Sequence, residues 1–76
     1  MRYFDRSDGR RYTIGDPERD LLGDWFVPTT RGSSNSRRGG VTCYVAGSQA
    51  DAEQRIARLV QRRLQHGYLE RPWVTV

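Results

Sequence analysis

The sequence predicts a small α+β domain: an antiparallel sheet of about four to five strands with one long amphipathic α-helix packed on one face. Two observations support this class. Short β-prone runs separated by turn residues occupy most of residues 2 to 46, and apolar residues then recur at helical spacing over residues 49 to 66. The 76 residues allow one domain, and the single cysteine excludes an internal disulfide.

The first strand pair is predicted around Asp8-Gly9, because this dipeptide is a strong hairpin signal between β-prone residues. We expect strands near residues 2 to 6 and 10 to 15. The acidic segment from residue 18 to 24 is then expected to form a loop, which its two leucines anchor to the domain.

A third strand is expected at Trp25–Val27, where three apolar residues follow one another and Trp25 is assigned to the core. Pro28 cannot donate a ladder hydrogen bond, so this strand is expected to be short or irregular, at an edge or a bulge. The stretch Thr29–Gly40 contains three arginines and no apolar side chain. It is interpreted either as an exposed connection or as a loop that holds phosphate with glycine backbone and arginine side chains.

The fourth strand is predicted at Val41–Val45, because Val41, Cys43 and Val45 alternate with polar neighbours and share one apolar face. On that face Cys43 is expected to be an inert small hydrophobe rather than a reactive thiolate. Nothing else in the sequence forms a catalytic set, so we predict no enzyme activity, no metal site and no cofactor.

The helix is predicted from about residue 49 to 66, with Ser48 as its N-cap and Gly67 as its stop. Its apolar stripe needs a sheet face to cover. Beyond it, the segment from Tyr68 to Val76 is interpreted as an extended tail containing Trp73 or as a last strand. Residues 1–69 are assigned to the domain and residues 70–76 to the tail. The apolar runs are too short to span a bilayer, and we expect a cytoplasmic protein without membrane contact.

All thirteen basic residues are arginine, against nine acids, which leaves a net charge of +4. A small basic domain attracts polyanions, and clustered arginines strengthen that attraction. On the predicted helix, Arg55, Arg58, Arg62 and His66 fall in one stripe. Such a stripe is usually a solvated face, but together with the Thr29–Gly40 arginines it would make a basic surface if both lie on the same side of the sheet.

Several segments together resemble the WGR domain, a DNA-binding module of poly(ADP-ribose) polymerases and of small stand-alone bacterial proteins. Residues Arg11 to Ile14 resemble the family's aromatic-x-Ile strand, and Asp20 to Trp25 are similar to its Asp-Leu-Phe-Gly-x-Trp. Arg37 to Gly40 are similar to its Thr-Arg-Gly-Gly turn. The Gly67-Tyr68 pair, preceded by the basic Arg63, resembles the family's Gly-Tyr ending.

The motif that names the family is replaced in this chain. Arg31-Gly32-Ser33 occupies the place of Trp-Gly-Arg, so that only the glycine is kept, and Ser34 to Ser36 replace the Ile-Gly-Thr that follows. In the polymerases that tryptophan and arginine help to hold DNA near a strand end. Their absence here puts recognition of DNA ends in question.

The resemblance and the charge together predict a nucleic-acid-binding module that contacts DNA backbone phosphates with little sequence specificity. The alternative is a protein-interaction module on a WGR scaffold that has lost DNA binding, with an acidic protein or a second copy as its partner. The residues expected to contact nucleic acid are Arg31, Gly32, Ser33, Arg37, Arg38, Arg55, Arg58, Arg62 and Arg63.

Overall fold

A computed structural model describes residues 1–33 and 36–72. This part of the chain forms six strands and one helix: β1 (Arg2–Asp5), β2 (Arg10–Ile14), β3 (Glu18–Arg19), β4 (Trp25–Ser33), β5 (Ser36–Ala46), α1 (Gln49–Gln65) and β6 (Leu69–Arg71). The strand pairings are antiparallel. The predicted α+β class with an antiparallel sheet is confirmed, and the sheet has six strands, more than expected.

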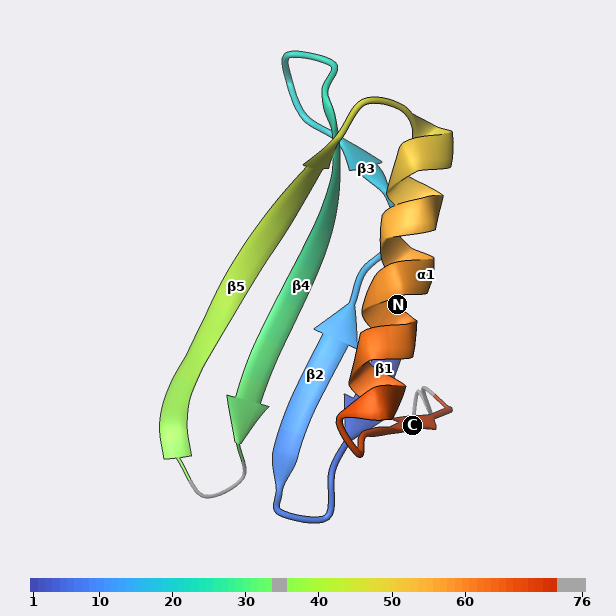
Figure 1. Ribbon diagram of the computed structural model, residues 1–76. Helices are drawn as coiled ribbons and strands as arrows, with labels where there is room; N and C mark the ends of the chain where they lie inside the picture. Colours follow the sequence, from blue (N-terminus) through green and yellow to red (C-terminus); the bar gives the residue numbers. More distant parts are fainter. Residues whose placement is uncertain (34–35, 73–76) are drawn as a thin grey trace.

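Strand β4 is an internal strand of the sheet and pairs with three others. One of its edges pairs with β5, while the other pairs first with β3 and then with β2, followed by β1 and β6. The β4–β5 hairpin is the longest feature of the sheet, and the helix lies alongside the strands with its C-terminal end near the start of β2 (Figure 1). The region where β2, β4, β5 and the helix end come together is the one that carries the candidate site.

The β1–β2 hairpin forms as predicted. The Asp8 carboxylate accepts a hydrogen bond from the backbone N–H of Arg10 at 3.2 Å, and Gly9 adopts a φ of 91°, which favours glycine. The Arg6 guanidinium donates to the same carboxylate at 2.5 Å. This contact lowers the pKa of Asp8 from 3.8 to about 2.

We predict that this hairpin contributes to acid stability in a defined pH window. Because the pKa of Asp8 is depressed in the folded state to about 2, its stabilising contribution is present above about pH 4 and is lost as the pH falls toward 2. An NMR titration of the Asp8 carboxyl should give that low midpoint. In thermal unfolding experiments, the Asp8→Asn variant should lack this part of the loss of folding stability at acid pH. A carboxyl that titrates near 4 would contradict the prediction.

Pro28 lies inside a central strand, so the expectation of a short or edge strand was wrong. The Pro28 carbonyl accepts from the Gly15 N–H at 2.8 Å, and its backbone therefore points away from β5, where no N–H is needed. On this edge of β4, which faces away from β5, Pro28 falls between the residues that pair with β3 and those that pair with β2. The proline nitrogen, which has no hydrogen to donate, therefore lies where the partner of β4 changes from β3 to β2. The strand continues through Pro28.

The acidic segment is also different from the prediction. Glu18 and Arg19 form β3, and the turn that follows is shaped by Asp20, whose carboxylate accepts from two backbone N–H groups at 2.9 Å each. Leu21 and Leu22 are exposed at the tip and anchor nothing. The turn is held by polar contacts of its own backbone, which local sequence patterns of apolar residues do not reveal.

Trp25 is half-buried and lies outside the core, contrary to the prediction. The Arg19 guanidinium lies 5.5 Å from the centre of its ring. The core instead consists of Phe4, Tyr12, Ile14, Val27, Ala52, Leu59 and Tyr68.

Strand β5 is longer than predicted and faces the other way. Tyr44 and Ala46 pack against the core, while Val41, Cys43 and Val45 are exposed on the opposite side. The three residues do share one face, as the alternation indicated, but that face is open. Most of Thr29–Gly40 belongs to the β4–β5 ladder, which pairs Arg31 with Gly40 and Ser33 with Ser36, so the exposed-connection interpretation was wrong for these residues.

The helix begins and ends as predicted. The Ser48 hydroxyl accepts from the Asp51 N–H at 3.1 Å, and Gly67 has the positive φ of a helix stop. Ala52 and Leu59 are buried in the core, and α1 contacts β4, β5 and β6. No described helix is long and apolar enough to cross a membrane.

The segment after the helix joins the sheet. Leu69–Arg71 pair with β1, and the Arg2 guanidinium donates two hydrogen bonds of 2.7 Å to Glu70. Arg71 donates to Asp5 at 3.0 Å. The segment expected as a tail therefore begins as the sixth strand, and Trp73 lies outside the described residues.

Candidate nucleic-acid interface

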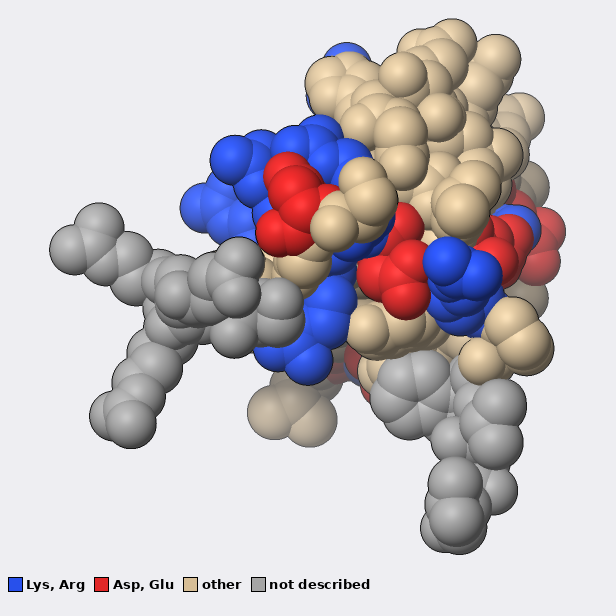
Figure 2. All heavy atoms as spheres, turned by 90° about the horizontal axis from the view of Figure 1, so that it is seen from below, with Lys and Arg blue, Asp and Glu red and all other residues tan. Residues whose placement is uncertain are grey.

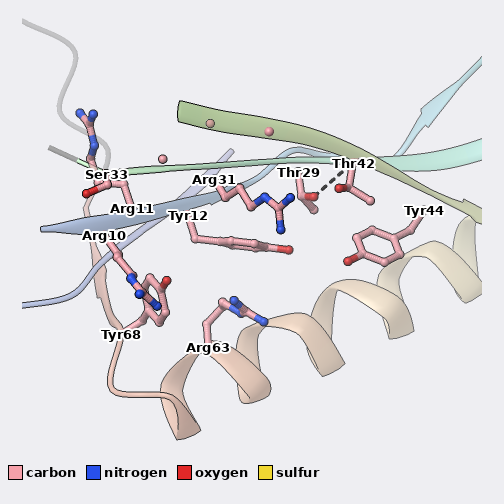
Figure 3. A pocket seen from close by; sticks show the side chains of 13 residues that line it. Arg10, Arg11, Tyr12, Thr29, Arg31, Ser33, Thr42, Tyr44, Arg63 and Tyr68 are labelled. Carbon is pink, nitrogen blue, oxygen red and sulfur yellow. Dashed lines mark hydrogen bonds between the residues drawn. The ribbon is translucent and has the colours of Figure 1, made fainter. Parts of the chain in front are cut away.

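A groove of about 830 Å³ opens where β2, β4, β5 and the C-terminal end of α1 meet (Figure 3). It is lined by four arginines, three tyrosines, glycines and hydroxyl side chains, and by no acidic residue. The lining residues are Arg10, Arg11, Tyr12, Thr29, Arg31, Gly32, Ser33, Gly39, Gly40, Thr42, Tyr44, Arg63 and Tyr68.

Two glycines of β5 let Arg31 enter this groove. Arg31 pairs with Gly40 across the β4–β5 ladder and with Tyr12 on the other side. A Cβ at Gly40 would lie 2.8 Å from the Arg31 Nε, and a Cβ at Gly39 would lie 2.8 Å from the Arg31 carbonyl oxygen. Only glycine at these positions leaves room for the arginine and its backbone.

We therefore predict a graded response to alanine along this motif. Gly39→Ala must displace backbone and should cost about 1–3 kcal/mol of folding stability, as overpacking does. Gly40→Ala meets only the flexible Arg31 side chain, so it should displace the guanidinium and weaken anion binding with a smaller loss of stability. Gly32→Ala, whose Cβ would meet nothing within 4 Å, is the control for folding stability. Urea denaturation and phosphate titration by NMR measure both effects, and equal losses for all three variants would contradict the prediction.

Arg63 projects from the last turn of the helix onto the tyrosines. Its guanidinium carbon lies 4.4 Å from the centre of the Tyr12 ring and 5.6 Å from that of Tyr68. These cation–π contacts hold the side chain in place. The Nε of Arg63 is buried and has no hydrogen-bond partner among the described residues. A buried donor without an acceptor carries a desolvation cost.

Tyr12 lies between the side chains of Arg31 and Arg63 (Figure 3). Burial raises the pKa of its phenol above the ordinary value of 10.0, so the hydroxyl stays protonated at neutral pH. Beside it, the Thr29 hydroxyl donates to the Thr42 carbonyl at 3.0 Å, which ties β4 to β5. The groove therefore has a neutral hydroxyl-bearing floor between positive walls.

Part of the positive charge of this region is not neutralised within the described part of the chain. Arg10 at the groove pairs with Asp8 at 3.5 Å. Arg31 and Arg63 form no ion pair there, whereas Arg2, Arg6 and Arg71 each pair with a carboxylate. Seen from below, the molecule gathers arginine side chains on this end, with a few acidic side chains between them (Figure 2). Positive charge without a partner is thus concentrated at the groove.

The structure brings together only some of the residues that the sequence nominated. Arg31, Gly32, Ser33 and Arg63 line the groove. Arg37 and Arg38 belong to β5, and their side chains fall outside what the structure describes.

The other three helical arginines lie in a neighbouring depression. Arg55, Arg58 and Arg62 line a hollow of about 430 Å³ next to the groove. Tyr44 lines both hollows, and the Arg55 guanidinium lies 5.3 Å from the centre of its ring. Among the described side chains, Arg31 of the hairpin and the helical arginines therefore line two adjoining hollows.

Sequence reasoning missed Arg10, Arg11 and the three tyrosines. Strand alternation could have placed Arg10 beside Tyr12 on one face of β2. That Arg31 then lies next to Tyr12 depends on the β2–β4 register, which joins distant segments and has no local signal.

The described residues contain no group of three or more His, Cys, Asp or Glu side chains that could hold a metal ion. In the comparisons with known proteins, no family model, no curated protein and no solved structure matches this chain.

Proposed function

We propose that this chain is a WGR-like nucleic-acid-binding module that holds backbone phosphates of DNA in the groove, with little base readout. The observation that carries the proposal is the pair Arg31 and Arg63, which lie without ion-pair partners among the described residues, on either side of a groove lined by no acid. In this proposal α1 covers one face of the sheet and its last turn forms a wall of the groove. The module acts in the cytoplasm of a bacterial cell and catalyses no reaction.

The chemistry of the groove suits a phosphodiester. Guanidinium groups form short charge-assisted hydrogen bonds with phosphate oxygens, and tyrosine and threonine hydroxyls add neutral donors. The open backbone at Gly32, where a Cβ would meet nothing, leaves space for the sugar-phosphate chain to approach. Contacts of this kind position a nucleic acid but do not read its bases.

The adjoining hollow extends the interface. The next phosphates along the strand would bind to Arg55, Arg58 and Arg62. Their hollow adjoins the groove, because the Tyr44 side chain lines both. An extended row of arginines binds a polyanion mainly by releasing its counterions. The affinity should therefore depend steeply on salt and weakly on sequence.

The test is a salt titration of binding to short duplex and single-stranded DNA, followed by fluorescence anisotropy. If about four phosphates are neutralised, log K should fall with log salt at a slope near −4. Two duplexes of unrelated sequence should give the same affinity within about threefold, since phosphate contacts carry no sequence information. Undetectable binding at low salt, or binding that does not respond to salt, would reject the proposal.

A further inference from the structure

The outer edge of β5 is the longest free strand edge in the described sheet. Strand β5 pairs only with β4 and spans 11 residues, whereas the strands at the other ends of the sheet, β3 and β6, span 2 and 3. The free edge is visible along one side of the molecule in Figure 1. A strand edge presents unpaired N–H and C=O groups and is a template for another strand.

Most of this edge lacks the features that normally prevent pairing. Proteins protect exposed edges with charged residues or proline. The two charged residues of β5, Arg37 and Arg38, lie near its N-terminal end, and residues 39–46 contain neither a charge nor a proline. Val41 and Val45 are each 72% exposed, and Cys43 between them is exposed as well. This part of the edge is therefore uncharged and apolar on its open face.

The backbone groups that face outward can be assigned from Pro28. The Pro28 carbonyl points to Gly15, away from β5, and Pro28 lies opposite Cys43 in the ladder. Residues opposite one another in an antiparallel pair point their backbone groups either toward each other or both away. The N–H and C=O of Cys43 therefore face the free edge. By alternation, those of Val41 and Val45 do so too.

We infer that β5 pairs antiparallel with β5 of a second copy of this chain, around a two-fold axis at Cys43. The Val-x-Cys-x-Val pattern is symmetric about this residue, so Val41 of each copy faces Val45 of the other and the two Cys43 face each other. The outward backbone groups match in the same register. An interface of this kind is self-complementary, as two-fold symmetry requires.

Other registers are less favourable. An axis at Val41 would place Arg37 opposite Val45 of the second copy, inside the paired region. An axis at Val45 would run past the strand end at Ala46 after one further pair. An axis at Cys43 pairs Gly40 through Ala46 with the same segment, which is uncharged throughout.

The response to salt separates this association from DNA binding. Each copy carries a net charge of +4, so two copies repel one another at low salt. Salt screens that repulsion, with a Debye length of about 10 Å at 0.1 M. Dimerisation should therefore strengthen as salt rises, while DNA binding weakens. An experiment can thus reject dimerisation without rejecting DNA binding, and the reverse.

A charge-swap experiment at Cys43 tests the register. Sedimentation equilibrium of the full chain should show a dimer for the wild type and for Cys43→Ser, with an affinity that increases with salt. Cys43→Arg and Cys43→Asp each place like charges opposite one another on the axis and should dimerise about fivefold more weakly. An equimolar mixture of the two should recover the dimer, because arginine then faces aspartate.

Circular dichroism checks that each variant folds, which the exposure of Cys43 favours. A wild-type chain that stays monomeric up to about 1 mM at high salt would overturn the inference, since a dimer with a Kd of about 1 mM would already be partly formed there. So would charged variants that dimerise as well as Cys43→Ser, or a mixture that recovers nothing.

Discussion

Replacing Arg31 and Arg63 together with glutamine should weaken DNA binding about 100-fold at low salt and make the salt slope shallower by about two. Both side chains border the groove, and neither has an ion-pair partner among the described residues. A hydrogen bond to a charged group contributes about 1.5–3 kcal/mol, and each phosphate that the variant no longer neutralises keeps its counterion. Fluorescence anisotropy across a range of salt measures both quantities.

The matched control is the double replacement Arg2→Gln and Arg71→Gln. It changes the net charge by the same amount, but these arginines pair with Glu70 and Asp5 on the β1–β6 side of the sheet. We expect it to weaken binding by less than about fivefold, the effect of a distant screened charge. If the control loses as much affinity as the groove variant, net charge alone explains the binding and the groove is not the site.

Replacing Phe4 with alanine should remove most of the folding stability. Phe4 is fully buried in the centre of the core, and truncating such a side chain costs about 3–5 kcal/mol. At roughly 0.05–0.15 kcal/mol per residue, a domain of this size has only about 4–11 kcal/mol to lose. Urea denaturation followed by tryptophan fluorescence should show a midpoint shifted far toward zero, or an unfolded chain.

Leu21→Ala is the control for this prediction, because Leu21 is an apolar residue at the tip of the β3–β4 turn with a relative exposure of 105%. Its replacement should change the unfolding free energy by no more than about 0.5 kcal/mol. A loss comparable to that of Phe4→Ala would mean that the leucine is anchored to the domain, as its apolar character alone would suggest.

The elements that the sequence predicted well are those built from local interactions. The β1–β2 hairpin depends on Asp8 and Gly9 at the turn itself, and the helix depends on Ser48, its apolar spacing and Gly67. Each of these interactions joins residues within a few positions of one another. A pattern in the sequence is therefore enough to find them.

The elements that the sequence mispredicted depend on partners far along the chain. Pro28 is tolerated in a central strand because two different strands meet beside it, and no local pattern encodes that meeting. The alternation identifies the apolar face of Val41 and Val45, but which face of β5 packs against the core is decided by residues far along the chain. The β3–β4 turn is an exception, because Asp20 shapes it through local hydrogen bonds and its leucines stay exposed.

The candidate site shows the same division. The positive charge, the glycines beside Arg31 and the amphipathic helix that ends near Arg63 follow from the sequence alone, since these are properties of composition and spacing. The arrangement of the arginines does not follow from it. Arg10, Arg31 and Arg63 line one hollow together with Tyr12, while Arg55, Arg58 and Arg62 line the next. The reason is physical. The register of β2 on β4, and the rotation of the helix over the sheet, are set by burying Phe4, Tyr12, Val27 and Leu59 together, a collective condition on distant residues.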